Sequence, residues 1–176
     1  MLHRNTLTGI AQSRGFTLLE LLVTVVVVGV LAAVALPSMG WMANAARLTG
    51  TTDEMVSTIQ LARAEAVRLN SRVRVCGSTD GTTCAGSTSW SRWIVTGRDN
   101  VDAAPVTLRD TTASGDVEVS GPLNGIEFSP SGRIAAQTAV TVCLPVDLPP
   151  ENRQVVTVLI SGVVTKTPTN GGGVCP

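Results

Sequence analysis

Four patterns of hydrophobic and polar residues follow one another along the chain. Residues 1–15 are mostly polar, and residues 16–36 form an almost unbroken apolar run. From 37 to 71, apolar residues recur at helical spacing: Leu48, Met55, Ile59, Ala62, Ala66 and Leu69. From 72 to 176, short stretches of apolar and polar residues alternate, as in β-strands. The pattern predicts a polar N-terminal segment (1–15), a transmembrane helix (16–36), an amphipathic helix continuing it (37–71) and a globular β domain (72–176).

The apolar run is long enough to cross a membrane. At about 1.5 Å per residue, a helix from Phe16 to Leu36 matches a bilayer core of about 30 Å. Arg4 and Arg14 precede the run, and no basic residue follows it until Arg47. The positive-inside rule therefore predicts a cytoplasmic N-terminus and an exported domain.

The apolar run has three possible interpretations, and Glu20, near its start, helps to choose among them. A secretory signal peptide would use the stretch 33–35 (AVA) for cleavage, but its apolar core is normally about 7–15 residues. A plain anchor leaves Glu20 unexplained, because an unpaired carboxylate in a bilayer is costly. Cleavage between Gly15 and Phe16 accounts both for the length of the apolar run and for Glu20 within it. Glu20 would then lie one helical turn from the new amine and could neutralise that of its own or a neighbouring copy, which would set the register of stacked anchors.

The β-rich part of the chain contains eight candidate strands: 72–76, 90–96, 106–109, 117–120, 125–128, 133–135, 139–144 and 154–161. Segments rich in Gly, Ser, Thr and Asp separate them. No alternation of strands with helices occurs after residue 71, so the sheet is expected to be antiparallel. The prediction is an α+β fold with the long N-terminal helix packed on an antiparallel β-sheet domain. Residues 77–89 are expected to form an exposed loop, and "TPTNGGGVCP" (167–176) a flexible tail.

The four cysteines are Cys76, Cys84, Cys143 and Cys175. Together with an export-like N-terminus they predict two disulfides formed in an oxidising compartment. Three connectivities exist; proximity in sequence favours Cys76–Cys84, which leaves Cys143–Cys175. A zinc site built from all four thiolates is the alternative, but no C-x-x-C pair is present.

Composition argues against catalysis. The 13 basic and 13 acidic residues balance, and the single histidine is His3, so acid–base chemistry and metal binding by histidine are not expected. Ser131 and Ser161 have no evident base partner. The run 171–173 of glycines is not followed by the helix and lysine of a phosphate-binding loop. We expect no enzyme activity, cofactor or metal.

The stretch "RGFTLLELL" (14–22) resembles the class III signal of type IV pilins and type II secretion pseudopilins. The resemblance implies that a prepilin peptidase cuts after Gly15, removes the leader and N-methylates Phe16. It also implies that Glu20 is the family's assembly glutamate. Gly29 and Pro37 match positions where pilins usually have helix-loosening residues, since each weakens a helix.

Further motifs resemble the GspH/FimT/FimU family of minor pilins and pseudopilins: "LARAEAVRLNSRVRVCGS" (61–78), "WSRWIVTGRD" (90–99), "IEFSPSGRI" (126–134) and Ser161-Gly162. The resemblance implies a pilin fold and a subunit that initiates or caps a type IV pilus or a type II secretion pseudopilus. The implied partners are other major or minor pilins or pseudopilins, the prepilin peptidase and the inner-membrane assembly platform. The implied location is a single pass of the inner membrane with a periplasmic domain. "VCGSTDGTTC" and the tail cysteine slightly favour the pilus.

DNA binding is the second hypothesis. Some FimT-like proteins act in DNA uptake through a Gly-Arg-x-Arg segment at the final strand and tail. The corresponding stretch here, 162–165 (GVVT) followed by Lys166, lacks both arginines. An alternative basic patch would combine Lys166 with Arg63, Arg68, Arg72 and Arg74. Because the motif is absent, this hypothesis is disfavoured.

Overall fold

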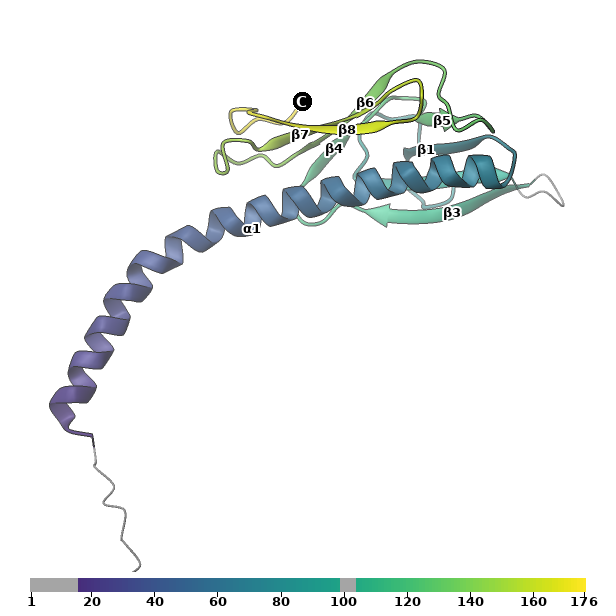
Figure 1. Cartoon of the computed structure of the whole chain (residues 1–176). Helices are drawn as coiled ribbons and strands as arrows, with labels where there is room; N and C mark the ends of the chain where they lie inside the picture. The colour runs from purple at the N-terminus through teal and green to yellow at the C-terminus, as the bar shows by residue number, and fades with distance from the viewer. Residues whose placement is uncertain (1–15, 99–103) are drawn as a thin grey trace, which may run out of the picture. The chain divides into compact units, whose positions relative to one another are not determined.

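The computed structural model describes residues 16–98 and 104–176, without the side chains of residues 34–39 (Figure 1). Residues 1–39 and residues 40–176 form two separate compact units. The leader predicted at 1–15, including Gly15 of the predicted cleavage site, lies outside the described residues, as does the side chain of Pro37.

One helix, α1 (Leu18–Arg68), contributes to both units. It ends in a hydrogen-bonded cap. The backbone N–H of Asn70 donates to the carbonyl of Val67 (3.3 Å), and that of Ser71 donates to the carbonyl of Ala66 (3.2 Å). Asn70 has a φ of 47°, the left-handed conformation that closes many helices and that asparagine tolerates. This cap ends the helix three residues before the predicted boundary at 71.

Two four-stranded antiparallel sheets complete the unit 40–176 (Figure 1). The first has the order β3-β2-β1-β5 and consists of β1 (Val73–Gly77), β2 (Arg92–Arg98), β3 (Pro105–Thr112) and β5 (Ile126–Phe128). The second has the order β4-β6-β7-β8 and consists of β4 (Glu118–Ser120), β6 (Thr138–Cys143), β7 (Arg153–Val158) and β8 (Val164–Thr169). The segment before β2 joins the sheets, since Ser89 pairs with Ser120. The predicted α+β fold, with a long helix on antiparallel sheet, is confirmed.

Two strand predictions are wrong. Residues 133–135 are not a strand, because they follow a tight turn in which Gly132 adopts a φ of 70°. Residues 164–169, of which the last three were expected in a flexible tail, form β8, which pairs with β7 along its whole length. β8 is an edge strand, where Pro168 is tolerated because its missing N–H can face away from the ladder. β8 lacks the alternation of apolar and polar residues that predicts a strand, because threonine, lysine and proline make up most of it.

The apolar stripe of α1 lies in the domain core. Leu48, Met55, Ile59, Ala62 and Ala66 are all buried. The same cluster contains side chains from both sheets: Trp93, Phe128, Val140 and Val156. The predicted amphipathic face of the helix is therefore the face that the two sheets cover.

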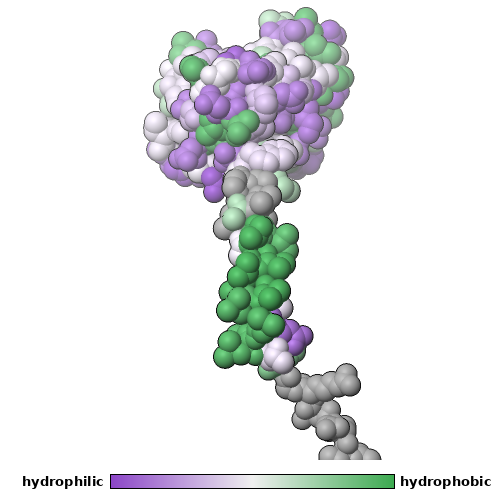
Figure 2. All heavy atoms as spheres, turned by 90° about the vertical axis from the view of Figure 1, so that its left-hand side faces the viewer, coloured by the Kyte–Doolittle hydropathy of each residue, from purple (hydrophilic) through white to green (hydrophobic). Residues whose placement is uncertain are grey.

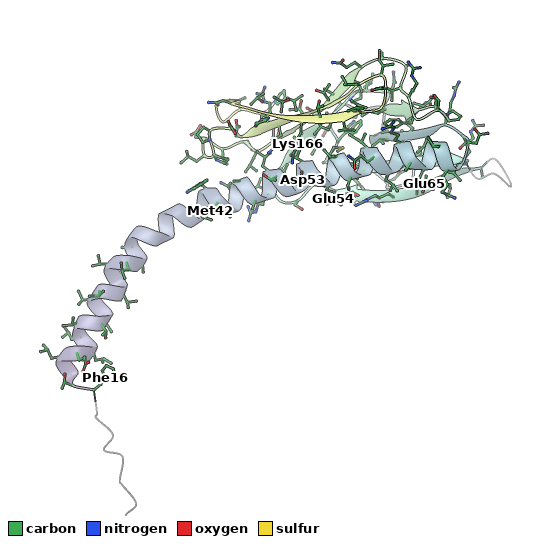
Figure 3. All side chains as sticks on the ribbon, viewed as in Figure 1. Phe16, Met42, Asp53, Glu54, Glu65 and Lys166 are labelled. Atoms are coloured by element: carbon green, nitrogen blue, oxygen red, sulfur yellow. A yellow bond between two sulfur atoms is a disulfide. The ribbon has the colours of Figure 1, made fainter. Side chains whose placement is uncertain are left out.

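Two neighbouring carboxylates tie α1 to the edge strands of both sheets. Asp53 accepts a bond from Lys166 of β8 (2.6 Å), and Glu54 accepts one from Arg109 of β3 (3.0 Å). Figure 3 labels Asp53, Glu54 and Lys166 in this region. All four side chains are partly exposed, so each pair contributes about 0.2–1 kcal/mol.

Two disulfides close the domain, with the pairing that sequence proximity favours. Cys76 at the end of β1 bonds to Cys84 in the following loop, and Cys143 at the end of β6 bonds to Cys175. Buried Asn152 also holds the C-terminal segment, since it donates to the carbonyl of Leu144 (2.9 Å) and accepts from the N–H of Gly171 (2.7 Å). The tail is therefore attached to the second sheet by covalent and polar bonds.

Candidate assembly site

The first turn of α1 carries the carboxylate that the sequence singled out. Thr17 precedes the helix and caps it: its hydroxyl accepts a bond from the N–H of Glu20 (3.2 Å), and its carbonyl accepts one from the N–H of Leu21 (3.1 Å). Glu20 is thus the third helical residue, at the positive end of the helix dipole, where a carboxylate is stabilised. Thr-x-x-Glu is also the spacing of a capping box. Thr17 is not among the residues predicted for this site, although its Thr-x-x-Glu spacing is present in the sequence.

Apolar side chains surround Glu20. From residue 16 to 33 every side chain is exposed, and Figure 2 shows them as an almost continuous hydrophobic surface. Glu20 is the one charged residue in this segment. The hydroxyl of Thr24 is satisfied within the helix by the carbonyl of Leu21 (2.8 Å). Glu20 therefore carries the polar chemistry that this surface offers to another molecule.

Among the residues that the structure describes, no helix combines the length and the apolar character that a membrane crossing requires.

Gly29 and Pro37 are the two residues expected to loosen the helix, and the structure describes the surroundings of Gly29 only. Gly29 lies within α1, and the space where a Cβ would stand is open. The side chain of Pro37 is not described. Their effect on the helix stays a prediction.

Each of the five cations of the alternative DNA patch has a partner within the domain. Arg68 pairs with Glu65 (2.7 Å), and Lys166 pairs with Asp53 (2.6 Å). Arg72 and Arg74 share Glu127, at 3.4 and 2.6 Å. Arg63 donates to the carbonyl of Gly162 (3.3 Å). Four of the five cations are thus paired with carboxylates, which reduces the positive potential available to a phosphate backbone.

Two open grooves lie on the domain. One, of about 570 Å³, is lined by Arg72, Arg74, Arg98 and Glu127. The other, of about 680 Å³, runs between α1 and the turn after β7, with Arg63, Val67 and Val163 in its walls. Neither holds a nucleophile beside a base. Within the described residues, no group of three or more His, Cys, Asp or Glu side chains is placed to bind a metal ion.

Two carboxylates with lowered pKa values lie in the domain, Asp80 in the loop after β1 and Asp110 in β3. Backbone N–H groups of Thr83 and Thr82, with the Thr83 hydroxyl, hold the pKa of Asp80 far below its usual range. The Arg92 side chain lowers the pKa of Asp110 by hydrogen bonding to it. Both arrangements fix local structure, because donors that favour the ionised form also hold its position.

Comparison with known proteins identifies the family. The model of the family described as type II transport protein GspH matches residues 51–163. The chain belongs to the GspH family. The model of the prokaryotic N-terminal methylation motif matches residues 10–36 of this GspH-family chain, a range that includes Gly15, Phe16 and Glu20. The resemblance stated from the sequence is confirmed: the chain is of the minor pilin or pseudopilin type found in type IV pili and type II secretion.

Solved structures of such proteins share the fold of the GspH-family chain. The type IV minor pilin FimU of Pseudomonas aeruginosa is 14% and 15% identical in two crystal forms, with TM-scores of 0.52 and 0.53. These matches cover 68% and 69% of this chain and 92% and 88% of FimU. The minor pseudopilin EpsH of the Vibrio cholerae type 2 secretion system is 13% identical, with a TM-score of 0.52, over 69% of this chain and 97% of EpsH. No curated protein matches the chain.

Proposed function

We propose that this chain is a minor subunit that initiates or caps a type IV pilus or a type II secretion pseudopilus. The observation that carries the proposal is the first turn of α1. A methylation motif leads into an exposed apolar helix whose one charge, Glu20, lies in that turn. An exposed apolar surface of this extent requires a lipid or protein partner. FimU and EpsH, which share the fold, are described as a minor pilin and a minor pseudopilin.

In this proposal the leader is removed between Gly15 and Phe16, and Phe16 is N-methylated. Phe16 then directly precedes the capping Thr17, so the new amine and the Glu20 carboxylate belong to the same end of the helix. In an apolar environment both charges are costly unless they are paired. A neighbouring subunit whose amine reaches Glu20 satisfies both, and only at one axial register.

Before assembly, the run 16–36 anchors the chain in the inner membrane. The arginines of the leader keep the N-terminus in the cytoplasm, and the disulfide-bonded unit lies in the oxidising periplasm. The partners are the prepilin peptidase, the inner-membrane assembly platform and other pilins or pseudopilins.

The test replaces Glu20 in the full chain. Glu20→Ala and Glu20→Gln should each reduce incorporation into filaments by about tenfold or more, since about 1.4 kcal/mol of lost pairing corresponds to tenfold. Thr24→Val is the matched control, because Thr24 is also exposed but bonds within its own helix. Incorporation is measured by the amount of the subunit in sheared filaments. Normal incorporation of both Glu20 variants would refute the pairing mechanism.

Processing is tested separately. Gly15→Leu should leave the leader attached, and intact-mass measurement of the membrane fraction would show it. A processed Gly15→Leu chain, or a wild-type chain that keeps residues 1–15, would refute cleavage at Gly15.

A further inference from the structure

The start of the unit 40–176 exposes apolar side chains. Trp41 is 48% exposed and Met42, labelled on α1 in Figure 3, is 59% exposed. The other tryptophans, Trp90 and Trp93, are 0% and 1% exposed. Trp41 is thus the one tryptophan of the three that can meet a molecule from outside.

Trp41 continues the stripe of α1 that faces the domain. It lies four residues before half-buried Ala45 and seven before buried Leu48, spacings that keep side chains on one face of a helix. The sheets cover this stripe at Leu48 but leave about half of Trp41 exposed. The apolar stripe of α1 therefore extends about one helical turn beyond the part that the two sheets cover.

Leu148 adds a second segment to this surface. It lies in the loop between β6 and β7 and is 59% exposed. Its carbonyl accepts a bond from the side chain of Asn44 (3.4 Å), three residues after Trp41 on α1. The bond brings the loop to the same end of the domain. We call Trp41, Met42 and Leu148 the Trp41 patch.

We propose that the Trp41 patch lies in the headgroup region of the bilayer while the subunit is anchored; this rests on the proposed membrane anchor at 16–36. Trp41 follows Leu36 by five residues, which in a helix cover about 7.5 Å of axis. The headgroup region on each side of a bilayer core is about 5–8 Å thick. Tryptophan favours this region, because its ring is apolar and its indole N–H is a donor.

The charges near the patch indicate what the surface recognises. Asp147 and Glu151 flank Leu148 in the loop, Arg47 follows on α1, and all three are exposed. These groups form no basic cluster that would attract anionic lipids. The patch therefore recognises the boundary between apolar and polar layers, and its contact requires no anionic headgroup.

The test uses the full chain reconstituted in phosphatidylcholine vesicles whose acyl chains carry bromine near the headgroups. Bromine quenches tryptophan that touches it. We expect quenching of the wild type and its loss in Trp41→Phe, because Trp90 and Trp93 are buried in the domain. On the Trp41→Phe background, Leu148→Trp should restore quenching. Val67→Trp, 55% exposed but 26 residues further along α1, should not.

Vesicle flotation in the same samples reports the anchor independently. A chain that floats while Trp41→Phe is quenched like the wild type would overturn the inference and leave the anchor intact. Equal quenching of Leu148→Trp and Val67→Trp, or quenching that requires anionic lipid, would also overturn it. A chain that does not float would overturn the proposed anchor itself.

Discussion

The two parts of α1 differ in how much of their apolar surface is buried: residues 18–33 expose it, and the stripe within residues 48–66 is buried. Between Leu18 and Ala33 every side chain is exposed, and the single charge is Glu20. Between Leu48 and Ala66 the apolar stripe is buried under two sheets, and Asp53 and Glu54 pair with the edge strands. One part of the helix is stabilised by its own domain, whereas the other exposes its apolar surface. Substitutions in the two parts should therefore have different effects: on the stability of the domain in the first case and on the proposed assembly in the second.

The largest expected effect contrasts a buried with an exposed apolar residue of this helix. Ile59→Ala should lower the free energy of unfolding by about 2–5 kcal/mol, because Ile59 is fully buried. Val26→Ala, at an exposed position, should change it by less than about 0.5 kcal/mol. The measurement is denaturant unfolding of the full chain in detergent, followed by the fluorescence of Trp90 and Trp93. Equal losses would refute the contrast.

The two disulfides should contribute unequally to the free energy of unfolding of the unit 40–176. Replacing Cys143 and Cys175 with serine should cost about 3.5 kcal/mol, and replacing Cys76 and Cys84 about 2.5 kcal/mol, because the first bond closes the longer loop. Their sequence separations are 32 and 8. The same unfolding assay measures both, and leader removal should be unaffected. A larger cost for the shorter loop would show that Asn152 and its bonds hold the tail without the disulfide.

A pair of glycines in α1 sharpens the comparison further. Gly50 and Gly29 both lie within the helix with open space at the Cβ position. Gly50→Ala should stabilise the domain by about 0.5–1 kcal/mol, as alanine does in helices. Gly29→Ala should leave the stability of the domain unchanged, since it lies in the other unit, but reduce incorporation if a loosened helix is needed. No change in incorporation would contradict the helix-loosening role.

The smallest expected effect concerns the tie between α1 and β8. Asp53→Ala and Lys166→Ala should each cost about 0.2–1 kcal/mol, because both side chains are about half exposed. A double-mutant cycle in the unfolding assay isolates the pair. Because this pairing also neutralises Lys166, DNA titrations at increasing salt should show little binding by the wild type and more by Asp53→Ala. Strong salt-dependent binding by the wild type would revive the DNA hypothesis.

How far the sequence predicted the fold depends on the range of the interactions. The amphipathic stripe from Leu48 to Ala66 was read correctly, because helical periodicity is local. The sequence pattern does not predict β8, because its threonines, lysine and proline form a strand only through pairing with β7. The charge pairs also cannot be predicted from the sequence, because their members are far apart in it. Arg74 and Glu127 are separated by 53 positions, and Lys166 and Asp53 by 113. These pairs give four of the five cations of the alternative DNA patch a carboxylate partner.

By itself the sequence determined the local features on which the proposed processing and assembly rest: Gly15 before Phe16, Glu20 four residues later, and the apolar run around it. Each of these features is a pattern of adjacent residues, so it can be recognised without knowledge of the fold. Only the tertiary structure decided which cations are paired with carboxylates, which strand lies at the edge of the second sheet, and that Leu148 bonds to Asn44 of α1. Those outcomes depend on contacts between residues far apart in sequence, which form only when the sheets pack on α1.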